Sequence, residues 1–357
     1  MTRLPKGFAS SKPPRRGVCY DESIWWRRIQ GQVGARRGQG AHTDHSMELK
    51  TKLLNPHLPV VFFEMVPPAK GKPQALETTM GEVARIQKLA DAINLPEIHD
   101  ESRGGDRTFK FVPRIEPRVL GGRIRKKLGM DVVLNRCVVY EADQAGWFRE
   151  TEEEYGIHNL ILVGGESSQI QYPGPDVIQT ARDIQATGLA STLGGISIPS
   201  RAHEVERIRR KVAEGLCFFT TQVLFDSNDI VWLVQRLNGL EARIILSFAP
   251  VSHPSDIEFL RWLGVDAPLD LDPFLIASLP TEKASSQGSE HAFERSLNLA
   301  KRILMDVFDN LPPDPPPLGI NIEHINRRNF NSAVRMLEQL GAFYSNLVAA
   351  RRRTSPV

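Results

Sequence analysis

An acidic residue, Glu64, interrupts the apolar run VVFFEMV at residues 60–66, directly before Pro67 and Pro68. A carboxyl group among apolar neighbours is costly to ionise when it is buried, so burial would raise its pKa. A carboxylic acid that stays protonated near neutral pH can serve as a general acid. The side chain could equally point outward and pair with a Lys or Arg of a helix, and the residue pattern alone favours neither alternative.

Polar residues recur at the ends of the apolar segments that follow. Glu166 comes after Gly164 and Gly165, which would permit close approach of a ligand to the backbone, although an ordinary loop with a helix-capping acid is the simpler explanation. Gln222 is an amide within FFTTQVLF, and needs a partner in a ligand or on a neighbouring strand. The other strand-end polar residues include Asn135, Ser197, Ser247, Glu323, His324 and Asn326. Such a polar ring would suit a polar heterocycle.

Patterns typical of metal and phosphate sites are weak. His99, Asp100 and Glu101 have the residue types of metal ligands, but no matching histidine has suitable spacing, so we expect a solvated loop and no metal site. The paired glycines lack the GxGxxG and GxxxxGK contexts of nucleotide-binding loops.

Eight β-rich segments alternate with longer amphipathic segments, which is typical of βα units in a parallel sheet. Because there are eight units, we predict a single-domain (β/α)8 TIM barrel, with an open doubly wound sheet as the alternative. The active site of such a barrel lies at the C-terminal ends of the strands. The predicted strands span residues 60–66, 93–98, 131–140, 159–165, 189–198, 217–225, 243–249 and 318–325.

Charge is unevenly distributed along the chain. Residues 1–46 contain nine basic and three acidic residues, whereas the whole chain has a net charge of +3, so the remainder is slightly acidic. This distribution argues against a nucleic-acid partner for the folded part. We expect a disordered basic leader at residues 1–50, with Met47 as an alternative start, a barrel at 51–345 and a basic tail at 346–357. The three cysteines and the absence of a long apolar run predict a cytoplasmic protein without a membrane segment.

Taken together, these motifs resemble methylenetetrahydrofolate reductase over roughly residues 60–340. FFEMVPP is similar to the family's FEFFPP, SRGGDRT to its Asp-Arg-Thr stretch, LVGGE to its ALRGD, TTQVLFD to its TQFFFD and NIEHINRRN to its FYTLNR. The resemblance implies that Glu64 is the catalytic acid and that Glu166 stands for the active-site aspartate. It also makes Gln222 the glutamine that contacts folate and nicotinamide. Asn326 matches the family, and with Ser197 of the polar ring it is a candidate substrate contact.

The resemblance implies reduction of 5,10-methylenetetrahydrofolate to 5-methyltetrahydrofolate by NAD(P)H, in most of the family through FAD. Protonation of N10 by Glu64 would open the imidazolidine ring, and Glu166 could stabilise the resulting N5-iminium cation. The flavin positions are only partly retained. Asn135 replaces a histidine and Gly164, before Gly165, replaces an arginine, while Glu204 and Lys211 remain similar. We therefore expect weak flavin affinity or none, with direct hydride transfer from NAD(P)H.

Two other functions remain open at this point. A tetrahydropterin-dependent methyl-group enzyme would bind folate without oxidising NAD(P)H. A non-catalytic, reductase-like subunit of a complex would need no acid in an apolar strand, so the retention of Glu64, Glu166 and Gln222 argues against it.

Overall fold

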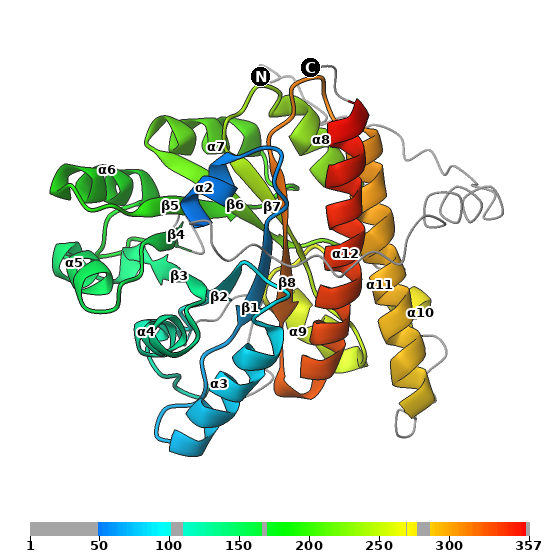
Figure 1. Cartoon of the computed structure of the whole chain (residues 1–357), viewed down its shortest axis with the longest axis horizontal. Helices are drawn as coiled ribbons and strands as arrows, with labels where there is room; N and C mark the ends of the chain where they lie inside the picture. Colours follow the sequence, from blue (N-terminus) through cyan, green and yellow to red (C-terminus); the bar gives the residue numbers. More distant parts are fainter. Residues whose placement is uncertain (1–48, 101–109, 166–169, 269, 277–285, 355–357) are drawn as a thin grey trace, which may run out of the picture. The chain divides into compact units, whose positions relative to one another are not determined.

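The computed structural model describes residues 49–100, 110–165, 170–268, 270–276 and 286–354. Eight parallel strands form a closed barrel in which each strand pairs with the next and β8 pairs with β1 (Figure 1). This confirms the predicted TIM barrel and excludes the open sheet. The strands are β1 (Val61–Met65), β2 (Ala92–Leu95), β3 (Asp131–Cys137), β4 (Asn159–Val163), β5 (Thr192–Ser197), β6 (Leu216–Val223), β7 (Arg243–Phe248) and β8 (Leu318–His324).

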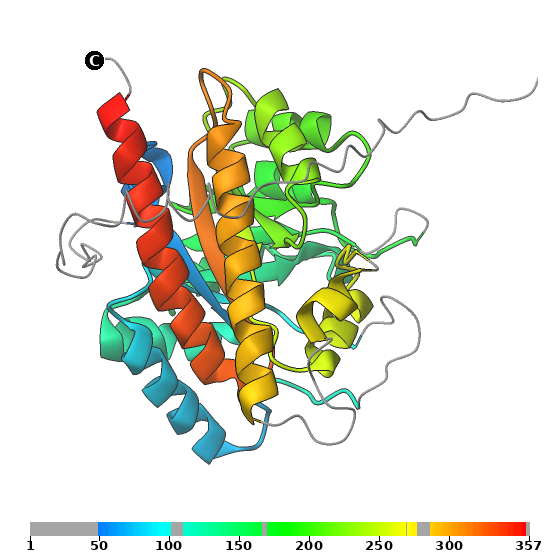
Figure 2. The ribbon, with the colours of Figure 1, turned by 90° about the vertical axis from the view of Figure 1, so that its right-hand side faces the viewer.

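The helices lie around the barrel, and the long α11 and α12 run side by side along it (Figure 2). The α-helices are α2 (Leu49–Leu54), α3 (Pro73–Ile86), α4 (Pro117–Leu128), α5 (Ala145–Glu153), α6 (Val177–Thr187), α7 (Glu204–Ala213), α8 (Asn228–Arg236), α9 (Pro254–Trp262), α10 (Leu271–Ile276), α11 (Ser286–Asp309) and α12 (Phe330–Thr354). Two short 3-10 helices follow strands β3 and β8, η1 (Val138–Tyr140) and η2 (Arg327–Asn329).

Most of the predicted strands are a few residues shorter in the structure, and two of the differences, at β3 and β2, have a clear local cause. The segment 138–140 forms η1 after β3, and β2 ends at Leu95, directly before Pro96. Proline has no N–H to donate to a strand ladder, so the pairing stops there. Residues 346–354, expected as a basic tail, are the last turns of α12.

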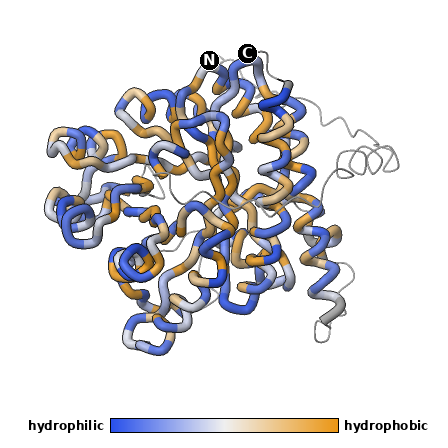
Figure 3. The backbone as a smooth tube through the Cα atoms, in the orientation of Figure 1, coloured by the Kyte–Doolittle hydropathy of each residue, from blue (hydrophilic) through white to orange (hydrophobic). Residues whose placement is uncertain are grey.

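Alternate residues of each strand face two separate apolar cores, as the two-residue period of a strand requires. Phe62 belongs to the core inside the barrel, whereas Phe63 belongs to the core between barrel and helices. Figure 3 shows the result along the chain: apolar stretches run through the strands, and polar and apolar positions alternate around the helices. Glu64 is two residues after Phe62 and therefore faces the barrel interior. The inner core comprises Leu49, Leu53, Val60, Phe62, Ala92, Val133, Ile161, Phe218 and Ile245.

Helix α2 closes the end of the barrel where the strands begin. Its Leu49 and Leu53 are part of the inner core, so residues 49 and 50, expected in the leader, belong to the barrel. The buried guanidinium of Arg243, at the start of β7, donates to the carbonyl oxygens of Leu53 at 2.9 Å and of Lys52 at 2.9 Å. The Lys52 ammonium also pairs with Asp91 at 3.0 Å. A six-residue helix is too short to be stable alone, so these contacts hold it in place.

Among the described residues, no helix combines the length and the apolarity that crossing a bilayer would require.

Gly194 of β5 is required by the packing inside the barrel, because a Cβ atom there would lie 2.5 Å from the ring of Phe218. We expect Gly194→Ala to lower the free energy of unfolding by roughly 1–3 kcal/mol, since overpacking a dense core forces the ring to move. Urea unfolding measures the effect. Gly81→Ala on the exposed surface of α3, where a Cβ meets nothing within 4 Å, is the control and should not destabilise. Equal stability of Gly194→Ala and the wild type would contradict this packing.

Candidate functional site

Five polar side chains meet at the C-terminal end of the barrel, on the strands nearest the β1–β8 seam. The amide nitrogen Nδ2 of Asn94 donates to Oε2 of Glu64 at 2.8 Å, and Nδ2 of Asn321 lies 3.4 Å from the same oxygen. Asn321 Nδ2 also lies 3.1 Å from Ser247 Oγ. Ser247 hydrogen bonds to Glu323, which is directly opposite Glu64 across the seam. We call these residues the carboxyl–amide cluster.

The partners of Glu64 settle the alternative that the sequence left open. Its carboxyl is bound by amides inside the barrel, and no ion pair joins it to a lysine or arginine among the described residues. Burial raises the pKa of Glu64 to about 7, even though the hydrogen bonds from Asn321 and Asn94 act to lower it. Burial, together with repulsion from Glu64, raises the pKa of Glu323 well above its ordinary value. The cluster therefore holds at least one proton at neutral pH.

The segment after β1 is fixed by the segment that precedes α4. The backbone N–H of Lys70 donates to the carbonyl of Pro113 at 2.8 Å, and that of Ile115 donates to Pro68 at 3.0 Å. Ala69 and Arg114 form an antiparallel bridge between these hydrogen bonds. The two prolines of FFEMVPP thus turn the chain into a short two-stranded contact directly beyond Glu64, which limits the movement of the strand end.

Asn135 and Gln222 lie on the strands β3 and β6. Asn135 follows the inner-core residue Val133 by two positions and so faces the interior, where its buried Oδ1 accepts no hydrogen bond from the described residues. A buried amide oxygen without a donor is costly, and it is the kind of group that a ligand donor would satisfy. Gln222 is half-buried, at the irregularity in the pairing of β6 with β7.

Three predicted contacts lie around the junction of β5 and α7. Ser197 follows Ile196, which packs on the inner core, so Ser197 faces the helix side of the sheet, and it is completely buried. Glu204 is also fully buried, and it accepts from the backbone of Ile198 at 3.0 Å and from Arg201 at 2.7 Å. These neighbours give Glu204 a structural role in starting α7.

Lys211 occupies the same side of the sheet. Its ammonium donates to the carbonyl of Ile196 at 3.1 Å, and burial lowers its pKa to about 8. The carboxyl of Glu204 acts in the opposite direction and favours the charged form. The lysine therefore already has a hydrogen-bond acceptor and a nearby counter-ion within the fold.

Asn326 organises the chain after β8. Its side chain accepts from the backbone of Arg328 and Asn329, at 3.0 and 3.2 Å, and donates to Asp256 at 2.7 Å. Asp256 lies in the first turn of α9, so Asn326 ties the β8 loop to that helix. This arrangement gives Asn326 a structural role at the junction of β8 and α9.

The two glycines after β4 differ in their surroundings. A Cβ on Gly165 would lie 2.2 Å from the ring of Tyr172, so the glycine is required by that ring. A Cβ on Gly164 would make only an ordinary contact with Val177. The acid that caps the N-terminus of α6 is Asp176, whose carboxylate accepts from the backbone N–H of Gln179. Glu166 and the SRGGDRT segment lie outside the described residues.

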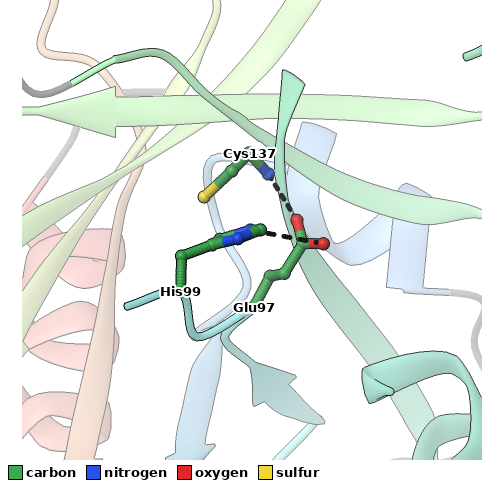
Figure 4. Close-up of side chains that lie close together, drawn as sticks. All are labelled: Glu97, His99 and Cys137. Carbon is green, nitrogen blue, oxygen red and sulfur yellow. Dashed lines mark hydrogen bonds and ion pairs between the residues drawn. The ribbon is translucent and has the colours of Figure 1, made fainter. Parts of the chain in front are cut away.

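A second polar cluster lies at the ends of β2 and β3, where Glu97, His99 and Cys137 converge (Figure 4). Each offers one potential ligand atom, and these atoms lie within 4.8 Å of one another. The Glu97 carboxylate is already engaged: it accepts from Arg136 Nη1 at 2.7 Å and from the Cys137 backbone at 2.8 Å. Hydrogen bonding to His99 and the charge of Arg136 hold the pKa of Glu97 below its ordinary value against the effect of burial. This network joins the two strand ends.

Sequence reasoning named Ser247 and Glu323 only as strand-end polar residues, and it missed Asn94 and Asn321. A usable signal was present, since both asparagines occupy inward positions of apolar strands. The register of a parallel pair, which places Glu64 beside Asn94 and Glu323, cannot be read from residue types.

No protein-family model matches the chain, and no curated protein matches it. Among solved structures, an uncharacterised protein from Clostridium thermocellum superposes with a TM-score of 0.63 at 20% sequence identity. The match covers 82% of this chain and 98% of that chain, and the structure is described as binding two copies of 5-methyl-5,6,7,8-tetrahydrofolic acid. At this identity the likeness shows that the two proteins share the barrel fold.

Proposed function

We propose that the protein reduces 5,10-methylenetetrahydrofolate to 5-methyltetrahydrofolate with NAD(P)H as the hydride donor. The observation that carries the proposal is Glu64, a carboxyl with a pKa of about 7 at the amide-lined, C-terminal end of a TIM barrel. That end is where barrel enzymes carry out their chemistry. The motifs around Glu64 and Gln222 resemble those of the reductase family in order and in position.

In this proposal, the protonated carboxyl of Glu64 gives its proton to N10 of the substrate. The C–N10 bond of the imidazolidine ring then breaks, and its electron pair goes to N10. The nitrogen N5 shares its lone pair with the same carbon to form an iminium cation, which accepts the hydride. Asn94 and Asn321 hold the Glu64 carboxyl in place and stabilise the carboxylate that remains.

The chemistry of the ligand in the similar structure supports a folate-type substrate. The protein from Clostridium thermocellum is described with 5-methyltetrahydrofolic acid, which would be the product of the proposed reaction. A reduced pterin has several N–H donors and a carbonyl acceptor. The unsatisfied oxygen of Asn135 and the amide of Gln222 offer groups that complement such a heterocycle.

The residues carried over from the family's flavin site do not fit a flavin. Glu204 is committed to Arg201 and Ile198, and Lys211 to a backbone carbonyl on the helix side of the sheet. The arginine that would meet the flavin phosphates is Gly164 in this chain. We therefore propose direct hydride transfer from the nicotinamide to the substrate, without a bound flavin.

The test is an anaerobic assay of the purified full-length protein with methylenetetrahydrofolate and either NADH or NADPH, after its visible spectrum has been recorded. We expect oxidation of one nicotinamide and formation of 5-methyltetrahydrofolate in equal amounts, with no flavin absorbance. Stoichiometric flavin absorbance would overturn the direct-transfer proposal. Tetrahydrofolate binding without nicotinamide oxidation would instead indicate a methyl-group enzyme, and the absence of both would indicate a non-catalytic subunit.

A further inference from the structure

A second carboxyl, the half-buried Glu323, stands beside the proposed acid and has no task in the mechanism above. Glu64 and Glu323 are paired in register on adjacent parallel strands. Adjacent strands lie about 4.8 Å apart, so two side chains that point to the same side of paired positions are neighbours. Glu323 is two residues after Asn321, which binds Glu64 inside the barrel, so both carboxyls face the interior.

The surroundings of the pair contain hydrogen-bonding groups but no compensating cation among the described residues. On β2 the facing group is the neutral amide of Asn94, on β7 the hydroxyl of Ser247, and on β8 the amide of Asn321. His324, the next residue of β8, lies against the rings of Phe63 and Phe330 on the other side of the strand. Arg136, at the neighbouring end of β3, is bound to Glu97 and Glu141.

Two adjacent, half-buried carboxylates without a compensating cation are unfavourable, because the two negative charges repel each other. The arrangement becomes favourable when one proton remains, since a protonated carboxyl can donate a hydrogen bond to an ionised neighbour. The oxygen atoms Oδ1 of Asn94 and Asn321, buried and without a donor among the described residues, can also accept from a protonated carboxyl. Within the described residues, the seam therefore has acceptors for a proton and no counter-ion for a second negative charge.

We infer that Glu323 is a positioning residue that shares a proton with Glu64 across the β1–β8 seam. The pair releases its two protons in two separate steps, and between these steps one proton is exchanged between the carboxyls. A fraction of Glu64 thereby stays protonated at pH values at which a single carboxyl would be ionised. This inference rests on the proposed function only where it concerns catalysis, because proton sharing is a property of the protein without substrate.

The first experiment follows the carboxyl groups directly, in protein labelled with 13C at the glutamate carboxyl carbon, by NMR as a function of pH. We expect two glutamate signals with strongly raised pKa values in the wild type and a single one in Glu323→Gln. The variant Glu258→Gln, which changes an exposed residue of α9, should keep both. Two independent titrations near the ordinary glutamate pKa would overturn the inference, whatever the activity of the protein.

The second experiment uses the pH profile of the reductase reaction. Glutamine has the size of Glu323 and a side-chain amide that can still hydrogen bond to Ser247, but it cannot hold the shared proton. We expect the ratio of kcat for Glu323→Gln to kcat for the wild type to fall about tenfold between pH 6 and pH 9, since the variant loses its only acidic proton above pH 7. A merely structural role would lower kcat by the same factor at every pH, and that outcome would contradict proton sharing. If the NMR titration shows two raised pKa values but no reduction occurs, the proposed function fails and the proton-sharing pair stands.

Discussion

The variant Glu64→Gln is expected to reduce kcat for methylenetetrahydrofolate by roughly 10²–10⁴-fold, which is the usual contribution of a general acid. Glutamine can still accept from Asn94, but it has no acidic proton to give to N10. Steady-state kinetics at pH 6.5, together with tetrahydrofolate binding, separates this loss from a loss of substrate affinity. The binding constant should change little, because the amide preserves the shape of the site.

The control for this variant is Glu258→Gln on α9, which removes a carboxylate from an exposed position and should leave kcat unchanged. An activity of Glu64→Gln within a few-fold of the wild type would contradict the acid role and would favour the non-catalytic alternative.

The raised pKa of Glu64 also predicts how stability depends on pH. The pKa is about 7 in the folded protein and near 4.5 in the unfolded chain, so folding favours the protonated carboxyl. The stability contributed by this group is fully present below pH 4.5 and is lost as the pH rises through about 7. The loss is on the order of 3 kcal/mol when the pKa difference is converted at 1.36 kcal/mol per pKa unit. Urea unfolding at pH 5 and pH 8 should therefore show a smaller decrease for Glu64→Gln than for the wild type.

The second large effect is expected at the opposite end of the barrel. Replacing Arg243 with Met should lower the free energy of unfolding by roughly 3–5 kcal/mol, because it leaves several buried carbonyl groups without donors. Arg243 is 1% exposed, and its guanidinium donates to the carbonyls of Leu53, Lys52 and Asn55 of the α2 segment and of Leu318 on β8. Urea unfolding measures the total loss, and hydrogen exchange of the α2 amides shows whether the helix detaches first.

An exposed arginine of α7 provides the matched control for Arg243. Arg207→Met removes the same charge from the surface and should change stability by less than about 0.5 kcal/mol. Equal free energies of unfolding for Arg243→Met and Arg207→Met would show that the hydrogen bonds from Arg243 do not hold α2 on the barrel. Because α2 lies at the start of the strands, far along the barrel from the carboxyl–amide cluster, the kcat of folded Arg243→Met should remain close to that of the wild type.

The fold class, and the place of Glu64 at the end of the first strand, could be predicted from residue types and their spacing. Short, nearly continuous apolar segments such as VVFFEMV alternate with longer amphipathic segments, and eight such units close most simply into a barrel. These features are local, because hydrophobic period and proline position act within a few residues. The last turns of α12 were predicted as a basic tail because they are rich in arginine. In the structure they continue the helix, and Leu347 and Val348 pack against the core between barrel and helices.

Tertiary structure alone decided the direction and the partners of each polar side chain. The split of Phe62 and Phe63 between two cores turned Glu64 inward, and strand register placed it beside Asn94 and Glu323, which are 30 and 259 positions away in the chain. The tertiary structure also placed Ser197, Glu204 and Lys211 on the helix side of the sheet. There, Glu204 and Lys211 already have hydrogen-bond partners within the fold. The physical reason is that a pKa and a hydrogen bond depend on groups brought together by barrel closure, and closure fixes distances that residue types and spacing do not contain.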